Sequence, residues 1–138
     1  MNFTDDERAA MKERASEVRA ARRGSKAKVD PEAELLAKIA EMGEADRVLA
    51  ERLHAIVKVA APELTPKLWY GMPAYARDGK IVCFFQPAAK FKYRYATLGF
   101  NDEAKLDDGE FWPIAYALTS LDAAVEERVT DLIRQAVR

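Results

Sequence analysis

The sequence is poor in the residues that build reaction centres. Its 138 residues include one cysteine, Cys83, and one histidine, His54. A single cysteine forms no internal disulfide, and one Cys with one His does not supply a zinc site of clustered Cys and His ligands. A Ser-His-Asp or Cys-His arrangement would have to use His54, which lies in a predicted helix with no spacing cue to a nucleophile. We therefore expect His54 to be a surface or helix-packing residue and Cys83 to be a small buried apolar residue.

Glycine clusters, long apolar runs and excess charge are also missing. The six glycines are scattered, so they form neither a P-loop nor a dinucleotide fingerprint. No run approaches the ~18 apolar residues of a membrane span, and the N-terminus lacks the apolar segment of a signal peptide. The net charge of −1 gives no bulk attraction to nucleic acid. We therefore expect a cytoplasmic protein with no membrane partner, and nucleic acid is not an expected partner.

What the sequence does have is a clear division by composition. Twelve of its thirteen aromatic residues lie within 69–116, and aromatic residues favour strands. The flanks are rich in Ala, Glu, Arg and Leu, which favour helices. This order predicts an α+β fold with helices around a mostly antiparallel sheet. We expect residues 1–29 to form a helical extension with a basic linker and residues 30–138 to form the domain.

Helix boundaries are marked by capping residues. Thr4 and Glu7 fit a capping box, and the basic stretch 19–28 is interpreted as a linker. Asp30 followed by a proline predicts a second helix start, and Asp122 predicts the start of the last helix. Apolar spacing then predicts two inward-facing stripes, Leu35-Leu36-Ile39-Met42 and Val48-Leu49-Leu53-Ile56-Val57.

The aromatic middle of the chain predicts an antiparallel meander of about five strands. Asp78 and Gly79 form a strong hairpin signal between two strands. The apolar run 81–85 predicts a central strand, and residues 114–118 predict the last one. Residues 91–100 alternate and are interpreted as one long strand. In that strand the aromatic residues would line the core, while Lys92 and Arg94 would face water. The alternative for these basic and aromatic residues is a platform for single-stranded nucleic acid.

Two segments carry candidate sites. The first is an acidic run that offers the oxygen ligands preferred by hard cations, although helix caps and turns explain it as well; its candidate metal ligands are Asp102, Glu103, Asp107, Asp108 and Glu110. The second is the segment 69–75, whose Gly-Met-Pro break resembles a bulge that would turn Trp69 and Tyr75 to a common ligand surface. The alternative is an aromatic core on a bent edge strand. The candidate ligand-binding residues are Trp69, Tyr70, Met72, Tyr75, Lys92, Arg94 and Trp112.

Taken together, several short motifs resemble the YdhG-like family of small bacterial proteins, which carry a domain of unknown function. The motifs are 69–75, 83–86, 90–92, 98–100, 106–109 and the Trp-Pro pair at 112–113. The resemblance covers roughly residues 32–137. It implies a two-layer fold like that of type III secretion chaperones, with helices on one face of a curved sheet. Some members are described as frataxin-like intracellular iron chaperones, which makes iron a possible ligand.

These observations leave several functions open. The first is a non-enzymatic binding protein for iron or another small ligand, and we do not expect an enzyme. The alternative is a protein-interaction module or homodimer with a chaperone-like fold. An enzyme would need acid-base chemistry from carboxylates, Lys or Tyr, for example a pocket joining Tyr75 or Lys92 to a carboxylate of raised pKa.

Overall fold

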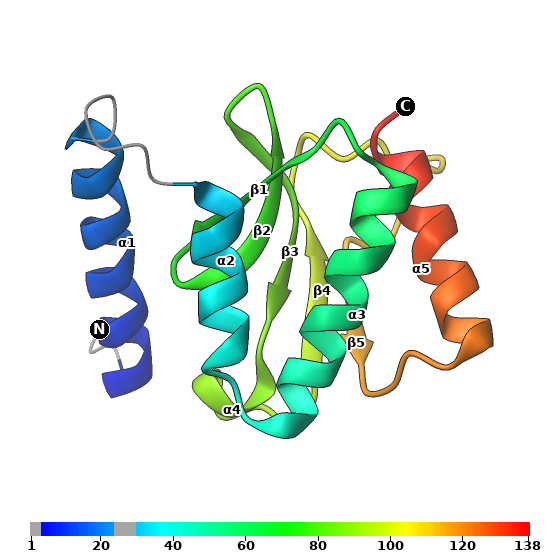
Figure 1. Ribbon diagram of the computed structural model, residues 1–138. Coiled ribbons are helices and arrows are strands. Elements are labelled where there is room, and N and C mark those ends of the chain that lie inside the picture. The colour runs from blue at the N-terminus through cyan, green and yellow to red at the C-terminus, as the bar shows by residue number, and fades with distance from the viewer. Residues whose placement is uncertain (1–3, 24–29) are drawn as a thin grey trace.

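A five-stranded antiparallel sheet forms one layer of the molecule (Figure 1). The computed structural model describes residues 4–23 and 30–138. Each strand pairs with the next in the chain, so the spatial order is β1-β2-β3-β4-β5. The strands are β1 (Thr65–Trp69), β2 (Met72–Arg77), β3 (Lys80–Gln86), β4 (Ala96–Phe100) and β5 (Ala115–Leu118). The predicted meander of about five strands and the α+β class are therefore confirmed.

Three helices cover one face of this sheet (Figure 1). They are α2 (Pro31–Ala40), α3 (Glu44–Ala60) and α5 (Ala123–Ala136), while α4 (Ala88–Phe91) is a single turn between β3 and β4. The helix α1 (Asp5–Arg23) lies beside α2, where it contacts β1 and α4. No helix in the described ranges, 4–23 and 30–138, is long and apolar enough to cross a membrane.

The predicted helix caps are present. Thr4 Oγ1 accepts a hydrogen bond from the Glu7 amide at 3.1 Å, and Glu7 Oε1 accepts one from the Thr4 amide at 3.3 Å. The Asp30 carboxylate accepts from the Glu32 amide at 3.0 Å, and the Asp122 carboxylate accepts from the Val125 amide at 2.9 Å. These side chains satisfy amides that have no partner within the helix, which explains why α1, α2 and α5 begin where they do.

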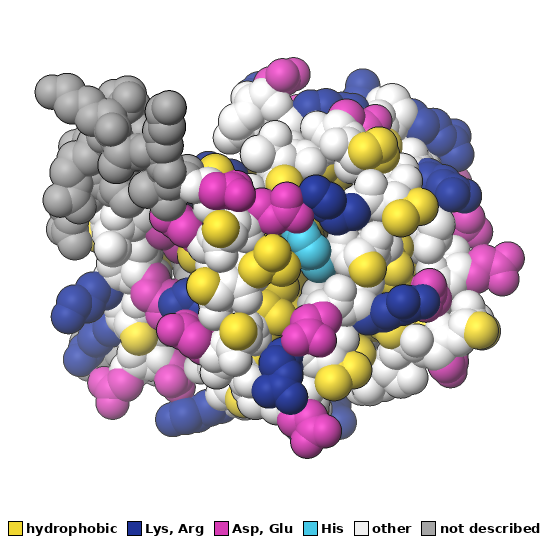
Figure 2. Space-filling model, in the orientation of Figure 1, with side chains coloured by type: hydrophobic (Ala, Val, Ile, Leu, Met, Phe, Trp, Pro, Cys, Tyr) yellow, Lys and Arg dark blue, Asp and Glu magenta, His cyan; other side chains and the backbone are white. Residues whose placement is uncertain are grey.

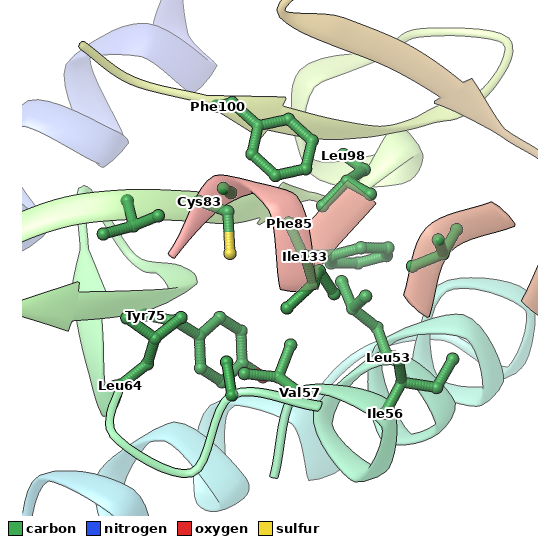
Figure 3. Packing of buried hydrophobic residues seen from close by; sticks show 14 of the residues in the cluster. Leu53, Ile56, Val57, Leu64, Tyr75, Cys83, Phe85, Leu98, Phe100 and Ile133 are labelled. Carbon is green, nitrogen blue, oxygen red and sulfur yellow. The ribbon is translucent and has the colours of Figure 1, made fainter. Parts of the chain in front are cut away.

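The hydrophobic core lies between the sheet and the three helices (Figure 3). Sheet residues such as Phe85 and Leu98 meet Leu53 of α3 and Ile133 of α5, and each of these side chains is almost fully buried. None of the described residues of α1 belongs to this cluster. The domain 30–138 thus supplies its own core, and α1 packs on it from outside.

Four sequence predictions about these elements are wrong. Residues 91–95 are not strand: Phe91 is the last residue of the α4 turn, Tyr93 is exposed, and the core instead receives Ala96, Leu98 and Phe100. The sheet irregularity lies between Tyr75 and Ala76 of β2 rather than at Gly71. Val48 and Leu36 are half exposed rather than inward-facing. The helix α1 continues to residue 23, into the expected linker, and residues 24–29 lie outside the described ranges.

Two tight turns connect the first three strands. The central residues of both turns have positive φ: Tyr70 (53°) and Gly71 (74°) between β1 and β2, and Asp78 (53°) and Gly79 (79°) between β2 and β3. This is the pattern of a type I′ turn, whose twist matches that of paired strands. The Asp-Gly hairpin is therefore confirmed. The Gly-Met-Pro segment is a second hairpin of the same kind and not a bulge.

Candidate functional site

The two aromatic residues expected to share a ligand surface lie on opposite faces of the sheet. Trp69 pairs across strands with Met72, which precedes Tyr75 by three residues. Because side chains alternate along a strand, Trp69 and Tyr75 point in opposite directions. Trp69 stacks edge-on against Phe84, at 5.2 Å between ring centroids, on the face away from the helices. Tyr75 is 1% exposed and points into the core (Figure 3).

The remaining candidate ligand residues are also dispersed. Met72 is buried, and Trp112 packs against the edge of the core. Lys92 ends α4 with φ 59°, and the Arg94 guanidinium lies over the Tyr95 ring at 5.4 Å. Tyr70 is exposed in the turn that follows β1. The structure therefore does not bring the seven residues into one pocket.

The acidic run has a similar outcome. Its carboxylates lie along the irregular segment between β4 and β5, where Glu103 forms an ion pair with Lys80 at 3.5 Å. Across residues 4–23 and 30–138, no three His, Cys, Asp or Glu side chains converge in a way that could hold a metal ion. The five candidate ligands, Asp102, Glu103, Asp107, Asp108 and Glu110, are therefore not assembled into a metal centre.

A chain of polar side chains connects α2 and α3 to the sheet. The Lys58 ammonium donates to Glu32 Oε1 at 3.0 Å, and Glu32 Oε2 lies 2.8 Å from His54 Nε2. On the other side of the ring, His54 Nδ1 lies 2.9 Å from the Tyr75 hydroxyl. Figure 2 shows the histidine at the surface between an acidic and a basic side chain. His54 is a packing residue, as expected. Its two hydrogen bonds, to Glu32 and to Tyr75, were not predicted.

The carboxylate fixes how the protons are placed in this chain. A carboxylate only accepts hydrogen bonds. In the neutral ring of His54, Nε2 therefore carries the proton and donates a hydrogen bond to Glu32. The Nδ1 atom then accepts from the Tyr75 hydroxyl. Hydrogen bonds from Lys58 and His54 hold the pKa of Glu32 below its ordinary value of 4.5. Burial raises the pKa of the Tyr75 hydroxyl far above its ordinary value, so Tyr75 stays neutral and acts as a donor.

The chain of hydrogen bonds from Glu32 through His54 to Tyr75 does not match the catalytic pocket that the sequence analysis considered. That pocket required a carboxylate of raised pKa, whereas the pKa of Glu32 is lowered. Cys83, the strand neighbour of Tyr75, is fully enclosed, and burial raises the pKa of its thiol to about 12. The chain of hydrogen bonds therefore links α2, α3 and β2. The absence of enzymatic activity stays a prediction.

A second polar assembly forms where α1 meets the domain. The Lys90 ammonium donates to Glu13 Oε2 at 2.8 Å, and Lys38 Nζ lies 3.6 Å from the same oxygen. Glu17 Oε1 accepts a hydrogen bond from the Gly71 amide at 2.8 Å. We name the Gly71 N–H group together with the ammonium groups of Lys38 and Lys90 the carboxylate cradle. Three elements build it: the β1-β2 turn, α2 and α4.

Gly71 makes this close approach possible. It is buried, and a Cβ atom built on it would fall on the Glu13 carboxylate and the Lys90 ammonium. Its φ of 74° also favours glycine over any L residue with a side chain. Its amide is free to bind Glu17 of α1. The residue therefore serves both the turn and the cradle.

The position of α4, which carries Lys90, is fixed by a buried acid of α3. Asp46 of α3 is 6% exposed, and its two oxygens accept hydrogen bonds from the Ala88 and Ala89 amides at 3.0 Å each. A carboxylate at a helix N-terminus satisfies free amides and opposes the positive end of the helix dipole. Asp46 thus anchors one wall of the cradle.

The helix α1 presents an acidic stripe to this cradle. Asp6, Glu13 and Glu17 lie on one side of α1, together with Ala10, which is 5% exposed. Asp6 pairs with Lys92 at 3.3 Å, and the Arg14 guanidinium lies over the Tyr70 ring at 5.6 Å. Figure 2 shows acidic and basic side chains close together where the described part of α1 meets the domain. The sequence contained this signal, because positions 6, 10, 13 and 17 follow the 4-3-4 spacing of one helix face.

Comparisons with known proteins identify no relative: no protein-family model, no curated protein and no solved structure matches the chain. The resemblance to the YdhG-like family and the likeness to secretion chaperones therefore stay predictions.

Proposed function

We propose that this chain is a non-enzymatic binding protein that recognises the carboxylate groups of an acidic ligand at the carboxylate cradle. The observation that carries the proposal is the docking of two carboxylates there, Glu13 on Lys90 and Glu17 on the Gly71 amide. Hydrogen bonds from an ammonium group or a backbone amide to an ionised carboxylate are charge-assisted, and they are stronger than hydrogen bonds between neutral groups. With α1 docked, Lys90 is 23% exposed and Lys38 30% exposed, so solvent screens the charges of an occupied cradle less than those of a fully open surface.

A direct test uses the full chain carrying Glu13→Gln and Glu17→Gln, which removes the charges that occupy the cradle. The Gly71 amide is the reporter in ¹⁵N NMR, because the chain has only six glycines and their signals are well separated from the rest. We expect octaglutamate to shift the Gly71 signal in a saturable way in this variant.

A matched variant with Lys90→Gln added should lose most of that shift, since it removes the donor nearest to the bound carboxylate. Octaglutamate that leaves the Gly71 signal unmoved, or that moves it equally without Lys90, would contradict the proposal.

A second candidate is a homodimer, which the sequence analysis gave as part of the alternative function. Its supporting observation is the exposure of large apolar side chains before β5, where Phe111 is 95% and Ile114 55% exposed. Exposed apolar side chains next to an edge strand favour association. Light scattering across a concentration series tests it, with Phe111→Ser as the variant that should reduce any association.

Iron binding, which the family resemblance implies, stays a separate proposal. Anaerobic calorimetric titration with Fe²⁺ tests it, and the variant with Asp107→Ala and Asp108→Ala is the matched control. Heat that is absent, or that is unchanged in the variant, would count against a carboxylate iron site.

A further inference from the structure

We infer that the natural ligand of the carboxylate cradle is an acidic helix of a partner protein, and that α1 is an intramolecular competitor for it. This inference rests on the proposed function and adds the form of the ligand and the regulation of the site. The helical form follows from the occupant: the stripe of α1 places carboxylates at positions 6, 13 and 17 of one helix face. With that geometry, α1 reaches Lys92, Lys90 and Gly71 together.

The contacts that hold α1 are of a kind that a competitor can replace. Among the side chains that the structure describes, they are ion pairs and polar contacts, with Ala10 as the buried apolar residue on the docked side. Partly exposed ion pairs contribute little, typically about 0.2–1 kcal/mol each. None of the described α1 residues enters the core cluster. The release of α1 would therefore leave the core between sheet and helices intact.

The fit of α1 in the cradle is also incomplete. Glu17 Oε2 is buried and has no hydrogen-bond partner among the side chains that the structure describes, although its other oxygen binds the Gly71 amide. The Arg14 guanidinium is 3.7 Å away, too far for a good hydrogen bond. A buried acceptor without a partner disfavours the docked state. A partner helix that supplies a donor at this point would bind more tightly than α1 does.

Tethering explains how a weak helix can still block the site. A helix that belongs to the same polypeptide as its binding site has an effective concentration of about 1 mM there. A partner in solution must overcome that concentration, so its apparent affinity falls in proportion. Removing the charges of the α1 stripe should therefore unmask the cradle.

The experiment uses the full chain and, as probe, a synthetic peptide with the sequence of residues 4–23. Binding is measured by calorimetry and by the Gly71 amide signal, to wild type and to the variant with Glu13→Gln and Glu17→Gln. We expect the variant to bind the peptide about tenfold more tightly than wild type. The matched control peptide has the same composition. Lys12 and Glu13 swap places in it, and so do Ser16 and Glu17, so that these two glutamates stand at positions 12 and 16. That control should bind the variant at least about tenfold more weakly, because its acids leave the stripe.

The outcomes separate this inference from the proposed function. If the control peptide and octaglutamate bind as well as the helical peptide, the cradle recognises carboxylates but the helix requirement is wrong. If wild type and variant bind the peptide equally, α1 is no competitor. If no acidic probe moves the Gly71 signal, the proposed function fails as well.

Discussion

Two carboxylates of this protein, Glu32 and Glu13, have similar partners and very different positions in the fold. Each bridges two basic groups: Glu32 contacts Lys58 and His54, and Glu13 contacts Lys90 and Lys38. The partners of Glu32 continue inward, because His54 is bound to a tyrosine of the core. The partners of Glu13 do not continue into the core cluster. The same chemistry therefore connects the helices to the core at Glu32 and holds α1 against the outside of the domain at Glu13.

The difference lies in what is left behind when a contact is lost. Around Tyr75, a missing partner leaves a buried polar atom with no access to water, which is costly. Around Glu13, water and ions can solvate the separated charges. Changes to the first region should therefore alter the free energy of unfolding, and changes to the second should alter α1 docking.

The largest effect is expected from the core beneath the polar chain. Phe85→Ala removes a fully buried ring between the sheet and the helices. We expect a loss of about 3–5 kcal/mol in the free energy of unfolding, because the cavity adds to the lost burial. Urea unfolding followed by circular dichroism measures it. In the native state, the Gly71 amide signal should stay where it is in wild type, and a shifted signal would mean that core and cradle are coupled.

A smaller effect is expected when the polar chain loses one atom. Tyr75→Phe removes the hydroxyl and leaves His54 Nδ1 without its partner. We expect a loss of about 1–3 kcal/mol in the free energy of unfolding. The control is Tyr95→Phe, since Tyr95 lies outside the core cluster. Equal stabilities for the two variants would show that the buried hydrogen bond contributes nothing.

The polar chain should also make the free energy of unfolding depend on pH in the acidic range. The pKa of Glu32 is lower in the folded state than its ordinary value of 4.5, so its contribution to stability is present above that value. It is lost as the pH falls through the lowered folded pKa. Glu32→Gln should therefore flatten the decline of stability below about pH 4.5. Urea unfolding midpoints from pH 7 to pH 3 test this, and parallel curves for wild type and variant would refute it.

Much of the fold could be predicted because its determinants are local. Capping residues such as Asp30 and Asp122 act within three residues, and the Asp-Gly turn fixes its hairpin by backbone conformation alone. The 91–95 prediction failed because the determinant is remote. Asp46, far away in the chain, anchors the α4 turn through two amides, and Lys92 ends that turn with a positive φ. Alternation of aromatic and basic residues was a weaker signal than this cap.

The site was less predictable than the fold for the same reason. The motif 69–75 predicted a ligand surface built from aromatic rings. The group in this motif that binds the Glu17 carboxylate is instead the Gly71 amide. His54 and Lys58, four residues apart on one helix face, hinted at a shared acid, but Glu32 lies on another helix. Contacts between elements that are separated in sequence depend on packing, which residue types alone do not specify.

The smallest effect on stability, and the most selective one, is expected at the cradle itself. Glu13→Gln removes the charge bridged by Lys90 and Lys38, and we expect less than about 1 kcal/mol of change in the free energy of unfolding, because these groups are partly exposed. The same loss should be visible directly in the docking of α1. The Gly71 amide is held by Glu17 of the same helix, so its hydrogen exchange should accelerate when α1 is released more often.

In wild type, raising the salt concentration from about 0.05 M to 0.5 M should also accelerate the hydrogen exchange of the Gly71 amide, since screening weakens ion pairs near the surface. The control is the Phe85 amide in the central strand, whose exchange should not change with salt or with Glu13→Gln. If Gly71 and Phe85 respond alike, α1 and the core unfold together, and the two carboxylates do not differ in the way their surroundings indicate.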